Sequence, residues 1–118
     1  MRIEKGDIYL ADLGDRSMHD IGKIRPVLVF QNNFLNRMID ESAYKDVIII
    51  PLSSQIREND FTLKIDVRDK IEKESVVLCN AIKMVRADRL LLENGKLTVL
   101  RKNEIEKIET ILRLLFDM

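Results

Sequence analysis

The residue best suited to phosphate chemistry stands where an apolar segment begins with a proline. Arg25 comes directly before Pro26 and the apolar residues 27–30. A proline fixes its own φ and pushes the residue before it towards an extended conformation, so we expect Arg25 at the mouth of a rigid strand. Its planar guanidinium is always charged and can hold phosphate or carboxylate oxygens with two hydrogen bonds. The alternative is a surface arginine in a structural salt bridge.

A second apolar segment, residues 48–50, ends at Pro51 and is followed by hydroxyl and amide side chains, those of Ser53, Ser54 and Gln55. The hydroxyl of Ser53 can form a hydrogen bond with a phosphate oxygen. No base partner is evident for a serine nucleophile, so covalent catalysis is not expected. The alternative for Ser53 is a serine that simply caps the loop.

Further polar candidates lie in a loop that spans residues 14–23. Loops of this length within a compact domain are often functional. His19 has an ordinary pKa near neutrality and is a candidate for proton transfer, although a lone histidine in a polar loop is also simply exposed. Lys23 would add attraction for phosphate groups.

Two polar residues, Asn80 and Lys83, interrupt an otherwise apolar stretch. Polar breaks in a strand often face a site or an interface, so both are candidate contacts. Asn32 is another candidate, and it reads equally well as a turn-forming asparagine.

Composition indicates one domain over residues 1–118, with 46% hydrophobic residues and 20 basic against 20 acidic side chains. Nucleic-acid binders usually carry a basic excess, so any nucleic-acid binding must come from a local cluster. The single cysteine, Cys79, excludes an internal disulfide and reads as a small buried side chain. No apolar run is long enough to cross a bilayer and no secretory leader is evident, so we expect a cytoplasmic protein.

Patterning predicts short strands, two helical turns and one terminal helix. The clean alternation from Phe61 to Val67 indicates a strand with one solvated face. Asn103 is the expected N-cap of an amphipathic helix whose apolar residues recur at helical spacing. These elements predict a mainly β protein with appended helices, built on a small curved antiparallel sheet or barrel. The expected strands are residues 8–13, 26–31, 46–51, 61–67, 75–85 and 97–100, and the expected helical turns are residues 34–39 and 87–91.

Taken together, residues 23–31 and 48–55 resemble the active-site strands of the MazF/PemK-type toxins, a family of small ribonucleases. Residues 6–13 are similar to the opening strand of that family, and residues 75–83 to its late central strand. The match runs in order along nearly the whole chain. It implies a small SH3-like barrel of the PemK/CcdB type with a C-terminal amphipathic helix.

The resemblance also implies roles for single residues. Arg25 occupies the position of the family's catalytic arginine, and Ser53 that of its catalytic threonine. Asp20 falls where the family carries an acidic residue in the substrate-binding loop, so it joins His19 as a candidate proton acceptor. Ala81 stands where the family commonly has glutamine, which leaves the recognised RNA sequence open. The implied RNA contacts are Lys23, Asn32, Ser54, Gln55, Asn80 and Lys83.

In function, the resemblance implies the toxin of a type II toxin–antitoxin system. Such a toxin is a homodimeric endoribonuclease that needs no metal or other cofactor. It cuts single-stranded RNA at a short sequence, leaves a 2′,3′-cyclic phosphate and a 5′-hydroxyl, and is covered by an antitoxin with a disordered acidic tail. One histidine in the chain excludes a two-histidine ribonuclease mechanism. The alternatives are a CcdB-like gyrase inhibitor on the same fold and an SH3-like interaction module without enzymatic activity.

Overall fold

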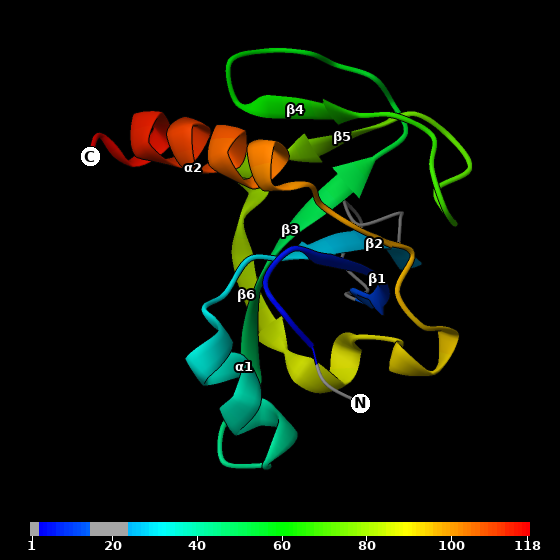
Figure 1. Ribbon diagram of the computed structural model, residues 1–118, viewed down its shortest axis with the longest axis vertical. Helices are drawn as coiled ribbons and strands as arrows, with labels where there is room; N and C mark the ends of the chain where they lie inside the picture. The colour runs from blue at the N-terminus through cyan, green and yellow to red at the C-terminus, as the bar shows by residue number, and fades with distance from the viewer. Residues whose placement is uncertain (1–2, 15–23) are drawn as a thin grey trace.

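The computed structural model describes residues 3–14 and 24–118, which form a curved antiparallel sheet with a long helix across one end (Figure 1). This arrangement confirms the expected mainly β fold with a C-terminal helix. In the described residues no helix has the length and apolar character needed to span a membrane. The strands are β1 (Asp7–Asp12), β2 (Ile24–Val29), β3 (Asp46–Ser53), β4 (Thr62–Ile65), β5 (Ser75–Leu78), β6 (Lys83–Arg86) and β7 (Thr98–Val99); the helices are α1 (Asn33–Asp40) and α2 (Lys102–Phe116); the 3₁₀ turns are η1 (Cys79–Ala81), η2 (Ala87–Arg89) and η3 (Leu92–Asn94).

The sheet has the strand order β4-β5-β3-β2-β1-β7, and β6 pairs with β3 as well. Strand β3 lies at the centre because it pairs with β2 along one edge and with β5 and β6 along the other. Successive side chains of a strand point to opposite faces. Both faces of the central strands are buried here, so the apolar residues sort into two cores. The core beneath α2 includes Ile8, Leu28, Ile50, Leu52 and Ile108, and the core on the other face includes Tyr9, Val27, Val47, Ile49 and Leu90.

The strand expected over residues 75–85 is broken in the structure, which corrects that prediction. Leu52 pairs with Val77 and Ile49 pairs with Lys83, so three steps along β3 match six steps along its partner. The three surplus residues form the turn η1, which contains Asn80. Such an insertion bends the sheet at this point, as β-bulges do, and turns the polar break into a corner of the fold.

The helix boundaries also differ from the expected ones. Residues 33–40 form a complete helix, not a single turn, and the side chain of Asn32 caps it by accepting a hydrogen bond from the backbone N–H of Leu35 at 2.8 Å. Helix α2 begins after Arg101, so Asn103 is not its N-cap. Instead, the carboxylate of Glu104 accepts a hydrogen bond from the backbone N–H of Arg101 at 2.8 Å. This bond draws the first turn of α2 closer to the chain that precedes it.

Candidate active site

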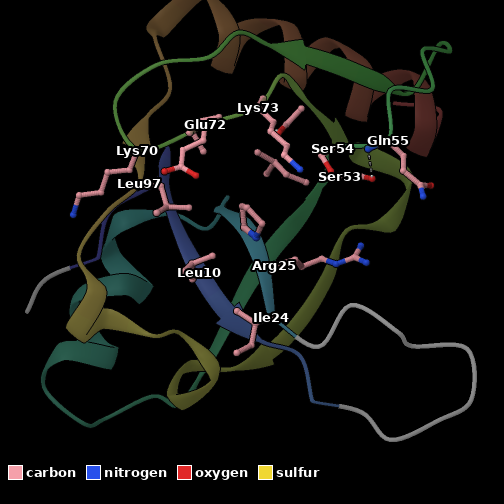
Figure 2. Close-up of a pocket in the computed structure, with 14 residues that line it drawn as sticks. Leu10, Ile24, Arg25, Ser53, Ser54, Gln55, Lys70, Glu72, Lys73 and Leu97 are labelled. Carbon is pink, nitrogen blue, oxygen red and sulfur yellow. Dashed lines mark hydrogen bonds between the residues drawn. The ribbon is translucent and has the colours of Figure 1, made fainter.

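A cavity of about 660 Å³ lies beside the ends of β2 and β3 (Figure 2). Its floor is apolar and includes Leu10 of β1 and Leu52 of β3. Its rim is polar and comes from β2, from the residues after β3 and from the segment that joins β4 to β5. The lining residues are Leu10, Ile24, Arg25, Pro26, Leu52, Ser53, Ser54, Gln55, Lys70, Ile71, Glu72, Lys73, Ser75 and Leu97. The two segments singled out in the sequence therefore converge on one cavity.

Arg25 and Ser53 each stand two residues beyond the last pair of the neighbouring antiparallel strands β2 and β3. The paired ladder between β2 and β3 includes Leu28 opposite Ile50 and reaches Val27 opposite Pro51. Extending this register by two residues sets Arg25 opposite Ser53, and opposed residues of antiparallel strands have neighbouring side chains. Both side chains are half-buried and both line the cavity. A single phosphate group could thus be contacted by the guanidinium and the hydroxyl together.

The hydroxyl of Ser53 is oriented by its own loop. Its Oγ accepts a hydrogen bond from the backbone N–H of Gln55 at 3.1 Å. Because a hydroxyl has one proton to donate, this contact leaves the proton free for a substrate oxygen. The loop-capping alternative for Ser53 is therefore also present, and it is compatible with a role in the site. Ser54 and Gln55 are exposed at the rim beside it.

Arg25 has no ion pair or hydrogen bond from its side chain to any other described residue, so the salt-bridge alternative finds no partner in that part of the chain. Lys73 adds a second cation to the lining; Lys70 also lines the cavity, but its ammonium donates a hydrogen bond to the carbonyl of Asn94 at 3.3 Å and points away from the cavity in Figure 2. Glu72 is the acidic side chain that the described residues contribute to the lining. The charge balance of the cavity wall is thus positive, although the charge of the whole chain is zero.

The other residues singled out in the sequence are distributed differently. Asn32, Asn80 and Lys83 are exposed and are not part of the cavity lining, so their contact with RNA stays a prediction. Asn32 has a structural role as the cap of α1. The predictions for His19, Asp20 and Lys23 fall on residues outside the described part of the chain.

Sequence reasoning missed Lys70, Glu72 and Lys73. The sequence around them reads only as a charged turn, and nothing local in it indicates a cavity wall. Their position depends on distant contacts, such as the hydrogen bond from the backbone N–H of Lys70 to the carbonyl of Leu97 at 3.0 Å. A single sequence gives no signal for such a contact.

Comparison with known proteins agrees with this geometry. Residues 4–116 match the family model of the PemK-like, MazF-like toxins of type II toxin–antitoxin systems. The chain belongs to this family. The resemblance seen in the sequence is therefore confirmed, and the roles of Arg25 and Ser53 stay predictions.

Individual relatives of this toxin chain cover nearly its whole length. The endoribonuclease EndoA of Bacillus subtilis (strain 168) is 28% identical over 117 residues, which are 97% of this chain and 94% of EndoA. A mycobacterial endoribonuclease solved with its cognate antitoxin superposes with a TM-score of 0.74 at 22% identity, over 98% of this chain and 96% of that one. A MazE–MazF structure from Deinococcus radiodurans gives a TM-score of 0.74 at 15% identity, over 100% and 98% of the two chains. These structures share the fold of this toxin chain.

Proposed function

We propose that this chain is the toxin of a type II toxin–antitoxin pair and that it acts as an endoribonuclease on single-stranded RNA. The observation that carries the proposal is the convergence of Arg25 and Ser53, from two neighbouring strands, on one cavity. Family membership supplies the toxin assignment, and a relative of similar length is an endoribonuclease. The proposed site of action is the cytoplasm.

The proposed reaction is an internal transesterification. The ribose 2′-oxygen attacks the phosphorus, the bond from phosphorus to the 5′-oxygen breaks, and the products carry a 2′,3′-cyclic phosphate and a 5′-hydroxyl. Negative charge grows on the phosphoryl oxygens as the attack proceeds. Arg25 faces that charge with two parallel N–H groups, and the hydroxyl of Ser53 donates a hydrogen bond to a phosphoryl oxygen. Both groups act without an added metal ion.

The proton transfers are assigned to the loop of residues 14–23. A base must take the proton from the 2′-hydroxyl, and an acid must give a proton to the departing 5′-oxygen. Arginine suits neither step, because its guanidinium stays protonated. Asp20 and His19 are the two candidates for the base, as the sequence indicates. The remaining proposed RNA contacts are Lys23, Asn32, Ser54, Gln55, Asn80 and Lys83.

The proposed protein partners are a second copy of this chain and a cognate antitoxin. The mycobacterial relative was solved with its cognate antitoxin, and the Deinococcus relative as a MazE–MazF structure. The positive wall of the cavity suits an acidic antitoxin segment that takes the place of the RNA backbone. Such an antitoxin would block cleavage by occupying the cavity.

The test is cleavage of a mixed-sequence RNA in excess EDTA by the wild-type protein and by Arg25→Ala. We expect cuts at one short motif with cyclic-phosphate ends, and a loss of about a hundredfold or more in the variant. Arg86→Ala is the matched control, because Arg86 is an exposed arginine of β6 outside the cavity. RNA left intact by a folded wild-type protein that still arrests growth would refute the proposal and point to gyrase as the target.

A further inference from the structure

Glu72 is a carboxylate in a wall that otherwise carries cations. Its neighbours Lys70 and Lys73 line the same cavity, yet Glu72 has no ion pair or hydrogen bond from its side chain within the described part of the chain. An unpaired carboxylate repels the phosphate groups that the wall attracts. Its presence therefore favours a substrate group other than phosphate, one that offers hydrogen-bond donors.

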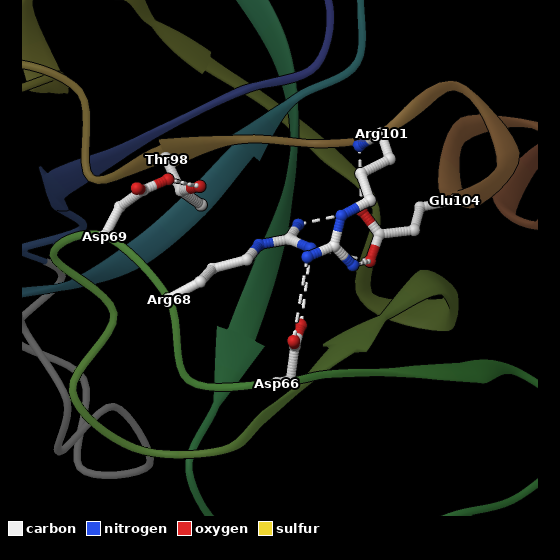
Figure 3. Close-up of polar contacts among 6 residues, drawn as sticks. All are labelled: Asp66, Arg68, Asp69, Thr98, Arg101 and Glu104. Carbon is white, nitrogen blue, oxygen red and sulfur yellow. Dashed lines mark hydrogen bonds and ion pairs between the residues drawn. The ribbon is translucent and has the colours of Figure 1, made fainter.

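The segment that carries Glu72 is held firmly in place (Figure 3). Arg68 donates two hydrogen bonds to Glu104 at the start of α2, at 2.8 and 2.9 Å. Thr98 donates a hydrogen bond to Asp69 at 2.6 Å. Ile71, directly before Glu72, is buried in the core. Because the residues directly before this position are held in this way, Glu72 projects from a rigid platform, as a recognition residue requires.

Glu72 is also set apart from the two residues that face the scissile phosphate. Figure 2 shows Arg25 and Ser53 on one side of the cavity, whereas Glu72 and Leu97 lie on the opposite side. The apolar floor of the same cavity includes Leu10, which lies below Leu97 in Figure 2. A flat nucleobase can pack on such a floor while its phosphate stays with the cations. Its hydrogen-bonding edge would then meet the carboxylate.

We infer that Glu72 is a specificity-determining residue that reads a base next to the cut, an inference that rests on the proposed function. A carboxylate at neutral pH only accepts hydrogen bonds. It can therefore pair with the amino groups of cytosine, adenine or guanine, which splayed single-stranded RNA exposes on the base edge. Uracil has no amino group, and its carbonyl oxygens flank its single N–H and repel the carboxylate. Glu72 selects an amino-bearing base and rejects uracil at one position of the recognised sequence.

The test compares wild type with Glu72→Gln on a random RNA library whose cut sites are read by sequencing. At one position near the cut, wild type should cut sequences with an amino-bearing base about tenfold or more often than sequences with uracil. Glu72→Gln should reduce this preference to about twofold, because an amide both donates and accepts hydrogen bonds. Glu74→Gln is the matched control. It removes the same charge from the same segment, but Glu74 faces Lys64 at 3.6 Å and does not line the cavity.

A second measurement keeps the inference separate from the proposed function. The same proteins select from a 2′-fluoro library, which cannot be cut because the attacking hydroxyl is missing. If wild type cuts no RNA, the proposed function fails. The sequences bound from the 2′-fluoro library then test by themselves whether Glu72 selects against uracil. Identical uracil ratios in wild type and Glu72→Gln overturn the inference in either assay. A rate loss on all sequences, with a shifted pH profile and an unchanged motif, overturns it too and makes Glu72 a proton-transfer group.

Discussion

Arg68 and Glu104 form a two-point ion pair that joins the segment after β4 to the first turn of α2 (Figure 3). Their side chains are only 10% and 9% exposed. The hydrogen bonds to Glu104 raise the pKa of Arg68, against the effect of its burial. Asp66 and Arg101 add exposed charges around the pair. The wall of the cavity is thus tied to the C-terminal helix by a contact that water barely reaches.

We expect Glu104→Ala to lower the free energy of unfolding by about 3 kcal/mol, because it leaves the buried guanidinium of Arg68 without its partner and the N–H of Arg101 without an acceptor. Urea denaturation measures the change. Glu106→Ala is the control, since Glu106 is an exposed acid in the same helix. A loss below about 1 kcal/mol would show that solvent screens this pair as it does a surface salt bridge.

Acid should weaken the fold through Glu104. Burial alone would raise the pKa of Glu104, but the hydrogen bonds from Arg68 and Arg101 together with their charges bring it below its ordinary value of 4.5. A lowered folded-state pKa contributes stability that is present above the ordinary pKa and is lost as pH falls through the folded value. Glu104→Gln should therefore flatten the fall in unfolding free energy below pH 4.5, measured by urea denaturation at several pH values.

Asp7 provides the opposite control for the pH experiment. Burial raises the pKa of Asp7, against a hydrogen bond from the backbone of Glu4 and the charge of Lys96. Its contribution to stability is complete below its ordinary pKa and is lost as pH rises through the raised value. Asp7→Asn should consequently make the acid loss steeper. Equal slopes in wild type and both variants would contradict these assignments.

Much of the fold could be predicted from the sequence because apolar runs and the alternation of apolar and polar residues indicate β strands. The break between β5 and β6 could not, since the polar residue Asn80 does not by itself show that the three residues of η1 leave the pairing with β3. The predicted start of α2 was wrong for a related reason. Asn103 has the right side chain for a cap, but the contact of Glu104 with Arg68 over a long sequence separation sets the first turn.

The candidate site was predictable to the extent that it lies on rigid strand ends. Pro26 and Pro51 lie near those ends in the sequence, and Arg25 and Ser53 beside them line one cavity. The opposite wall, with Glu72, was not predictable. It is held by side-chain pairs between segments far apart in the chain, and local propensity carries no information about them.

Ser53 should tolerate threonine better than alanine. Ser53→Ala removes a hydrogen-bond donor to the phosphoryl oxygens, and we expect RNA cleavage to slow by about ten- to a hundredfold. Ser53→Thr keeps the hydroxyl and should retain most of the activity. Ser54→Ala, at an exposed neighbour in the same cavity, shows the effect of a rim serine. Because Ser54 itself lines the cavity, Ser42→Ala, at an exposed serine outside the lining, is the reference for unchanged activity. Single-turnover cleavage rates measure the effect, and a Ser53→Ala rate equal to that of wild type would remove Ser53 from the reaction.

The thiol of Cys79 should be unreactive in the folded protein. Its side chain is fully buried in η1, and burial raises the pKa of its thiol to about 11. The thiolate is the reactive form, so little of it exists at neutral pH and no reagent reaches it. We expect no reaction with Ellman's reagent under native conditions and one thiol per chain in urea. Rapid native labelling would show instead that the β5–β6 corner opens readily, because η1 has to unfold locally before the sulfur is exposed.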